Sequence, residues 1–160
     1  MDEPLEVQVG KAIKARGWTL ATGESCTGGL LGHRITNVPG SSEYYLGGVV
    51  AYAYDAKERL LKVSHDTLYK HGAVSRETAM EMALGARQAL GADVGLSVTG
   101  IAGPGGGMPD KPVGLTWVAI STREGQHAER HVWQGDRLEI KTQSAEAALR
   151  LLLRTLEGKG

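Results

Sequence analysis

The sequence contains no phenylalanine and only one cysteine, Cys26. A single cysteine excludes a disulfide within the chain, which favours the cytoplasm as its compartment. Surplus charge is missing too, because 18 Lys and Arg residues balance 18 Asp and Glu residues. Proteins that bind nucleic acid through its phosphates need clustered surplus cations, and no basic run occurs here. We therefore predict no nucleic-acid partner.

Long apolar runs are also missing. No stretch approaches the length of a membrane span, and no basic segment followed by an apolar block opens the chain. We expect no membrane partner and no signal peptide. Glycine, in contrast, is abundant, with 23 of the 160 residues, which favours tight turns and close approach of the backbone to a ligand. The length suits one domain over residues 1–160 with one ordinary core, and a homodimer or other homo-oligomer is compatible with it.

The stretch 23–29, Gly-Glu-Ser-Cys-Thr-Gly-Gly, joins a β-leaning segment to a helical pattern that starts at Leu30. It places three hydroxyl or thiol groups at one turn: Ser25, Cys26 and Thr27. Amides that open a helix have no partner within it, so they suit an anion or an oxyanion. A simple helix cap with a tight turn explains the same residues. The stretch lacks the lysine of a P-loop and the second glycine of a hydrolase nucleophile elbow.

Helical and strand periodicities alternate along most of the chain. Two spacings, Asp55 to Glu58 and Asp136 to Glu139, are typical of capping boxes. A short turn at Glu124–Gly125 predicts an antiparallel hairpin. These patterns predict a three-layer α/β/α domain with a mixed sheet of about five strands. The expected helices are 4–16, 30–37, 55–63, 64–71, 75–90 and 136–156, and the expected strands are 18–23, 45–53, 93–100, 113–121 and 127–134.

A second loop follows the strand that ends near Tyr52, and Lys57 lies in the first turn of the next helix. A cation near a helix N-terminus is disfavoured, so this position favours a lowered lysine pKa. Partial burial beside the strand end, and Arg137 if it lies nearby, would lower the pKa further. A neutral lysine can take a proton from a serine hydroxyl. If the helix amides engage Asp55 and Glu58 as a capping box, Lys57 is left facing Ser25. The alternative is an ordinary solvated surface lysine.

A third loop, residues 99–107, contains five glycines in nine residues. Backbone amides in such a loop can form a nest for phosphate or carboxylate, and a flexible surface loop is equally compatible with this composition. The candidates here are Thr99, Gly100, Gly103 and Gly105. The five histidines show no metal-ligand spacing, so we expect no metal site and no cofactor.

Six ordered motifs together resemble the C-terminal domain of the bacterial CinA proteins, which also occurs alone as a nicotinamide-nucleotide amidase. Beyond the stretch 23–29, the resemblance rests on Val-Val-Ala-Tyr…Ala-Lys at 49–57, His-Gly-Ala-Val-Ser at 71–75, the glycine-rich 97–107, Lys-Pro-Val-Gly at 111–114 and Gly-Asp-Arg at 135–137. It implies a fold similar to anticodon-binding domains. It also implies hydrolysis of nicotinamide mononucleotide to nicotinate mononucleotide and ammonia.

The resemblance places the catalytic serine on Ser25, the lysine on Lys57 and the tyrosine on Tyr52. We expect Tyr52 to hold Lys57 and to relay its proton to the departing ammonia. The other motif positions become expected substrate contacts: Glu24, Cys26, Thr27, Gly28, Gly29, the loop residues named above, and Arg137, which could instead form a surface ion pair. The chain departs from the family pattern at Ala53–Tyr54, often Ser-Asn, and at Lys141, often arginine. A non-catalytic nucleotide-binding module of the competence or damage-inducible type, or a serine hydrolase acting on another amide, remains as an alternative.

Overall fold

A mixed sheet of five strands, in the order β2-β1-β3-β4-β5, forms the middle layer of the computed structural model, which describes residues 3–159. Strands β2, β1 and β3 run parallel, whereas β4 pairs antiparallel with both β3 and β5. The predicted mixed sheet and hairpin are therefore confirmed. The strands are β1 (Leu20–Glu24), β2 (Tyr45–Val50), β3 (Val94–Gly100), β4 (Leu115–Thr122) and β5 (Gly125–Val132).

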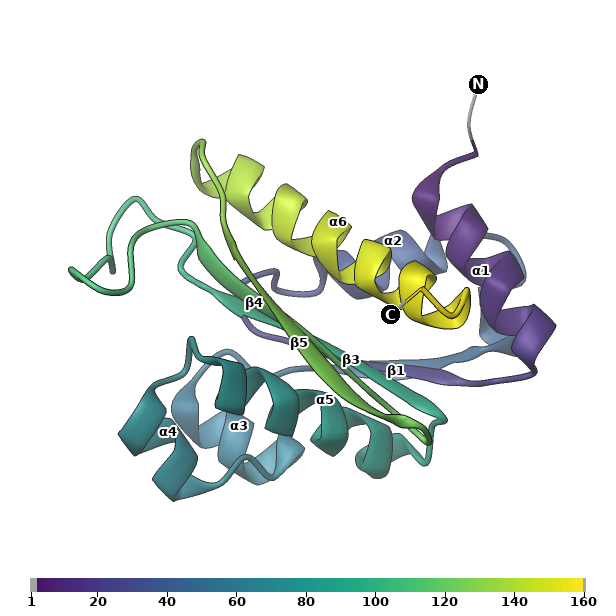
Figure 1. Ribbon diagram of the computed structural model, residues 1–160, viewed down its shortest axis with the longest axis horizontal. Helices are drawn as coiled ribbons and strands as arrows, with labels where there is room; N and C mark the ends of the chain where they lie inside the picture. Colours follow the sequence, from purple (N-terminus) through teal and green to yellow (C-terminus); the bar gives the residue numbers. More distant parts are fainter. Residues whose placement is uncertain (1–2, 160) are drawn as a thin grey trace.

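Two layers of helices cover the sheet, as Figure 1 shows. Helices α1 (Leu5–Arg16), α2 (Leu30–Thr36) and α6 (Arg137–Leu156) lie on one face. Helices α3 (Tyr54–Leu61), α4 (His65–His71) and α5 (Arg76–Leu90) lie on the other. A short 3₁₀ helix at Ser41–Glu43 precedes β2. No helix in residues 3–159 is long and apolar enough to cross a membrane.

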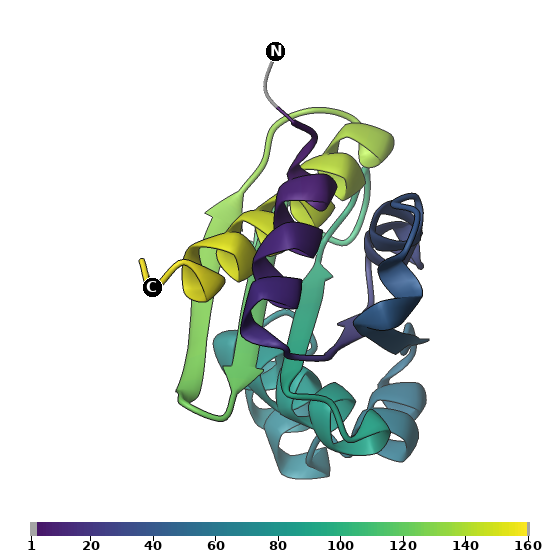
Figure 2. The same ribbon diagram turned by 90° about the vertical axis from the view of Figure 1, so that its right-hand side faces the viewer.

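Side chains of β4 alternate between the two cores, as the period of two in a strand requires. Val118 and Ile120 pack into the larger core beneath α1 and α6, two helices that run side by side in Figure 2. Trp117 and Ala119 face α5 instead. The ends of α1 and α5 were predictable from sequence, because a glycine in the left-handed conformation follows each helix: Gly17 after α1 and Gly91 after α5.

Two predicted caps have different outcomes. The capping box of Asp136 and Glu139 forms at the start of α6. The capping box at Asp55 is wrong: α3 begins at Tyr54, and no side chain caps it. Asp55 instead pairs with Arg59 one turn later, at 2.9 Å, because ion pairing within an exposed helix face competes with capping.

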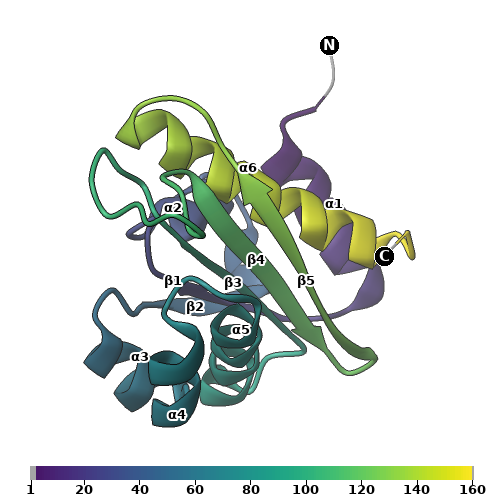
Figure 3. The same cartoon turned by 60° about the vertical axis from the view of Figure 1, so that its left-hand side comes forward.

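The carboxyl ends of the three parallel strands meet at one edge of the sheet. Strand β2 ends at Val50, earlier than predicted, and its chain then turns toward α3. The segment between β3 and β4 projects beyond this same edge in Figure 3. Open α/β sheets bind ligands at such an edge, so the fold brings together the three loops singled out above. Residues 1–2 and 160 of the expected domain lie outside the described range.

Candidate active site

The turn after β1 is held by a buried carboxylate. Glu24 ends the strand, is only 2% exposed, and points its side chain at the start of α2. The carboxylate accepts hydrogen bonds from the Thr27 hydroxyl at 2.6 Å and from three amides, those of Leu31 and Gly32 at 3.0 Å and Gly29 at 3.1 Å. The expectation that the opening amides of α2 are free to bind an anion is therefore wrong, because the protein supplies its own anion there.

Two amides of the turn stay available. Within residues 3–159, the amides of Cys26 and Thr27 donate to no other residue, whereas the amide of Ser25 donates to the Val98 carbonyl at 3.0 Å. The free pair directly follows Ser25. Adjacent amides after a nucleophile are suitably placed to bind an oxyanion.

Lys57 reaches this turn from the other side of the sheet edge. It shares the buried face of α3 with Leu61, four residues later, and is only 1% exposed. Its Nζ lies 2.9 Å from Ser25 Oγ and 2.8 Å from the carbonyl oxygens of Ala51 and Tyr52. All three hydrogen-bonding positions of the amine are thus filled, and one partner is the candidate nucleophile.

Burial lowers the pKa of Lys57 to about 8, and a smaller contribution from Cys26 opposes this shift. Removal of the amine from water is thus the largest cause of the lowered pKa. A neutral amine has two N–H donors and one lone pair. Those match two carbonyl acceptors and one serine hydroxyl that donates to the nitrogen, so the neutral form fits this environment without an unsatisfied group.

Cys26 is the rival nucleophile in the same turn. Its side chain is 6% exposed, and burial raises the pKa of its thiol to about 12. A cysteine reacts as its thiolate, so this thiol is poorly reactive at neutral pH. The geometry therefore favours Ser25, which has the base beside it.

These groups line a pocket of about 250 Å³. Arg137 also lines the pocket and links two of its other lining residues. One guanidinium nitrogen donates to the Gly103 carbonyl at 2.6 Å and another to the Tyr52 hydroxyl at 3.2 Å. The Tyr52 side chain is 62% exposed, and only its main-chain carbonyl contacts Lys57. The expected contact between tyrosine and lysine thus exists, but through the backbone rather than the phenol.

Nine of the thirteen expected site residues line this pocket: Ser25, Cys26, Tyr52, Lys57, Thr99, Gly100, Gly103, Gly105 and Arg137. The other four belong to the turn after β1 and do not line the pocket: Glu24, Thr27, Gly28 and Gly29. Gly100 must be glycine, since a Cβ there would lie 2.7 Å from Thr116 Oγ1.

Sequence reasoning missed five lining residues: Ala73, Val74, Ile101, Ala102 and Gly106. The motif at 71–75 was a signal for the first two, but apolar side chains carry no chemistry that would mark them as lining. Thr99 and Tyr54 hold this segment in place. The Thr99 hydroxyl donates to the Ala73 carbonyl at 2.8 Å, and the Tyr54 hydroxyl accepts from the Ala73 amide at 3.2 Å. One departure from the family pattern, Tyr54, therefore supports the pocket wall.

No group of three or more potential metal-ligating side chains gathers anywhere in the described part of the chain.

We expect Glu24→Gln to lower the free energy of unfolding by about 1–3 kcal/mol. The NH2 group of the glutamine would replace one carboxylate oxygen, so at least one buried N–H would face a donor instead of an acceptor. Turnover should fall with it, since the turn that aims Ser25 is loosened. Urea unfolding and initial rates measure both effects. Glu43→Gln is the matched control, because its carboxylate is exposed and pairs only with Lys14. Equal stability of the two variants would contradict the role given to Glu24.

Comparison with known proteins identifies the family. The model of the CinA C-terminal domain matches residues 2–156. The chain belongs to the CinA C-terminal domain family. A CinA-like protein of Salinibacter ruber is 53% identical over 155 residues, and one of Thermotoga maritima is 48% identical over 158 residues. These matches cover 97% and 99% of the chain but only 38% of each relative, so the chain spans under two fifths of their length.

Solved structures show the same fold over nearly the whole chain. A CinA superfamily protein from Klebsiella pneumoniae superposes with a TM-score of 0.93 at 35% identity, covering 96% of each chain. A competence/damage inducible protein from Agrobacterium tumefaciens gives a TM-score of 0.87 at 39% identity, covering 98% of this chain and 99% of that one. The three-layer fold with a mixed five-stranded sheet is thus the CinA fold.

Proposed function

We propose that this CinA-family protein hydrolyses the carboxamide of nicotinamide mononucleotide, releasing ammonia and nicotinate mononucleotide. One observation carries the proposal: the buried Lys57 amine lies 2.9 Å from the Ser25 hydroxyl, with its other two partners fixed. A serine beside a lysine of lowered pKa is a nucleophile with its base. The family resemblance supplies the substrate, and the pocket must then supply contacts for its parts.

The reaction proceeds through a serine ester. Ser25 Oγ bonds to the carboxamide carbon as its proton passes to the neutral Lys57 amine. The proton then moves from Lys57 to the departing nitrogen, the carbon–nitrogen bond breaks, and ammonia leaves. A water molecule, deprotonated by Lys57, attacks the ester carbon; its proton returns to Ser25 as the acid is released. The free amides of Cys26 and Thr27 stabilise the oxyanion in both halves.

The glycine-rich loop and Arg137 are assigned to the phosphate end of the substrate. In residues 3–159, the amides of Gly105 and Gly106 donate to no other residue, and both glycines line the pocket. Arg137 is bound to a carbonyl and a phenol rather than to a carboxylate, so its charge is not neutralised by an ion pair. Charge-assisted hydrogen bonds from guanidinium and amides favour a phosphate.

This assignment predicts that nicotinamide mononucleotide is cleaved much faster than free nicotinamide, by at least about 100-fold in kcat/KM, because binding of the remote phosphate positions the amide. Arg137→Ala should raise KM for the nucleotide with a smaller effect on nicotinamide. Arg150→Ala is the control on the same helix, as its guanidinium pairs with Glu146 instead. Equal kcat/KM for both substrates would exclude a phosphate subsite in this pocket.

Ammonia release from a panel of nicotinamide compounds tests the activity itself. Release from the nucleotide supports the amidase. Tight binding of the nucleotide with no ammonia would instead support the non-catalytic nucleotide-binding module, and faster release from an unrelated amide would assign a different substrate.

A further inference from the structure

Two arginines differ from the other eight in this chain. The eight each donate to a carboxylate, a carbonyl or a hydroxyl of the protein. Within residues 3–159, the guanidinium groups of Arg76 and Arg130 have neither a hydrogen bond nor an ion pair. They are separated by 54 residues in sequence, yet both line one cavity of about 410 Å³. Unpaired guanidiniums that line one cavity are candidates for binding an anion.

The fold itself brings these two side chains together. Arg76 is the first residue of α5, and Arg130 lies on β5 two residues after Ala128, which packs against α5. Residues two apart in a strand share a face, so Arg130 points to the α5 side of the sheet. Trp117, its cross-strand neighbour on β4, also lines the cavity. The cavity thus lies between the start of α5 and the β4–β5 hairpin.

A third cation joins them from the motif at 111–114. Lys111 lines the cavity and donates to the His71 carbonyl at 2.6 Å, but within residues 3–159 it meets no carboxylate within ion-pair distance. Two carboxylates are present as well: Asp110, and Glu77, which lies 3.7 Å from His71 Nδ1. Three cations against two anions leave a positive excess even with His71 neutral. Arg76 adds to it at a helix N-terminus, where a cation is disfavoured and an anion is stabilised.

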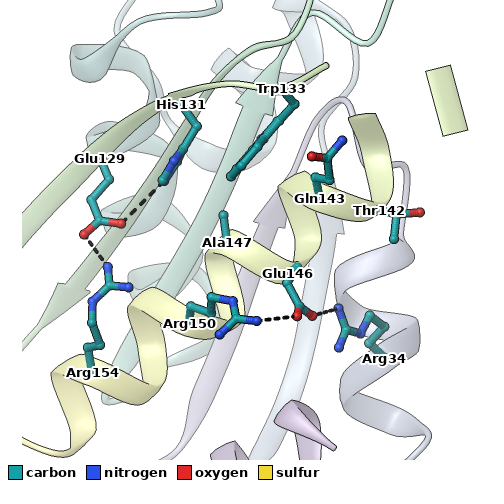
Figure 4. A pocket seen from close by; sticks show the side chains of 10 residues that line it. All are labelled: Arg34, Glu129, His131, Trp133, Thr142, Gln143, Glu146, Ala147, Arg150 and Arg154. Atoms are coloured by element: carbon teal, nitrogen blue, oxygen red, sulfur yellow. Dashed lines mark hydrogen bonds and ion pairs between the residues drawn. The ribbon is translucent and has the colours of Figure 1, made fainter. Parts of the chain in front are cut away.

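A larger cleft on the opposite face of β5 shows the contrast. It measures about 550 Å³, lies between β5 and α6, and has three guanidiniums at its wall. Figure 4 shows these tied to carboxylates: Arg154 to Glu129, and both Arg150 and Arg34 to Glu146. Neighbouring residues of one strand, Glu129 and Arg130, therefore face two different cavities, and only the α5-side cavity leaves its arginines without partners.

We propose that the cavity lined by Arg76, Lys111 and Arg130 is an anion subsite that binds a phosphate or diphosphate group. Bidentate guanidiniums and a lysine ammonium match the several oxygens and double charge of a phosphate better than the single charge of a carboxylate. Val74 lines both this cavity and the pocket that contains Ser25, so the two are adjacent. The subsite does not depend on amide hydrolysis, and binding alone tests it.

The experiment titrates inorganic pyrophosphate into the full chain at constant ionic strength and follows the indole N–H resonance of Trp117 by ¹⁵N NMR. Trp117→Phe assigns that resonance among the three tryptophans. We expect saturable binding that weakens at least about tenfold in the double variant Arg76→Gln/Arg130→Gln. The control Arg123→Gln/Arg150→Gln removes the same net charge from two ion-paired arginines and should change the affinity less than about twofold.

Competition then locates the source of the anion. If nicotinamide mononucleotide displaces pyrophosphate from the cavity, its single phosphate occupies this subsite rather than the position assigned above beside Arg137. If both bind together, the subsite takes a separate phosphate compound; either result supports it. Absence of a saturable shift, or equal weakening in the two double variants, would overturn the proposal, because the effect would then be general charge attraction. Circular dichroism of each variant confirms that its fold is kept.

Discussion

Ser25→Ala is expected to lower kcat for amide hydrolysis by at least about 10⁴-fold, because the attacking atom itself is removed. The hydroxyl contacts the protein only through the Lys57 amine, at 2.9 Å, among the hydrogen bonds of residues 3–159. Its loss therefore leaves the hydrogen bonds of the strand and the turn in place. Melting temperature and nucleotide binding should stay close to those of the wild type while ammonia release disappears.

Cys26 supplies the matched control for this variant. Cys26→Ser retains the size of the side chain and, on the assignment above, most of the activity, because a thiol with a pKa of about 12 contributes no thiolate at neutral pH. Mass spectrometry of acid-quenched wild-type enzyme should show an acyl adduct on the peptide that contains residue 25, and none in Ser25→Ala. Near-normal activity of Ser25→Ala, or inactivity of Cys26→Ser with an intact fold, would reverse the roles of these neighbours.

The architecture was largely predictable because its signals are local. Left-handed glycines and the capping box at Asp136 mark helix ends within a few residues of sequence. The strand order was not predictable, since pairing between β1 and both β2 and β3 depends on contacts far apart in the chain. Asp55 shows the limit of local patterns, because a capping-box partner at Glu58 and an ion-pair partner at Arg59 follow it directly, and the pair with Arg59 forms.

The candidate site was predictable where the type of side chain indicates its chemistry. Contacts that depend on the direction of backbone groups were not predictable. Ser25 and Lys57 were recognisable as a nucleophile and a base, and the structure brings them into contact. Glu24 and Tyr52 were expected to act through side chains facing the substrate or the lysine. Their actual contacts depend on which way a carboxylate and a carbonyl point at the end of a strand, and sequence carries no direct record of that direction.

Lys57→Arg should be as inactive as Lys57→Ala, because a guanidinium remains protonated and cannot accept the serine proton. In the wild type, kcat/KM should rise with pH through an apparent pKa near the value of about 8 that burial gives Lys57. Lys57→Met removes the base while preserving much of the side-chain volume, so it separates loss of chemistry from loss of packing. Substantial kcat in Lys57→Arg would mean that the residue provides only charge, and the serine–lysine mechanism would fail.

The pH dependence of the free energy of unfolding should report the protonation of the Lys57 amine without any measurement of turnover. The folded pKa of about 8 lies below the value of 10.5 for a free lysine, so between these pH values the unfolded chain binds more protons than the folded one. The free energy of unfolding therefore gains a contribution from Lys57 that rises with pH across this window and is absent below it, where both states are protonated. Urea unfolding of wild type and Lys57→Met at about pH 7, 8, 9 and 10, which span this window, measures the difference. A pH-independent difference between the two proteins would show that Lys57 is protonated in the folded state throughout, leaving Ser25 without a base.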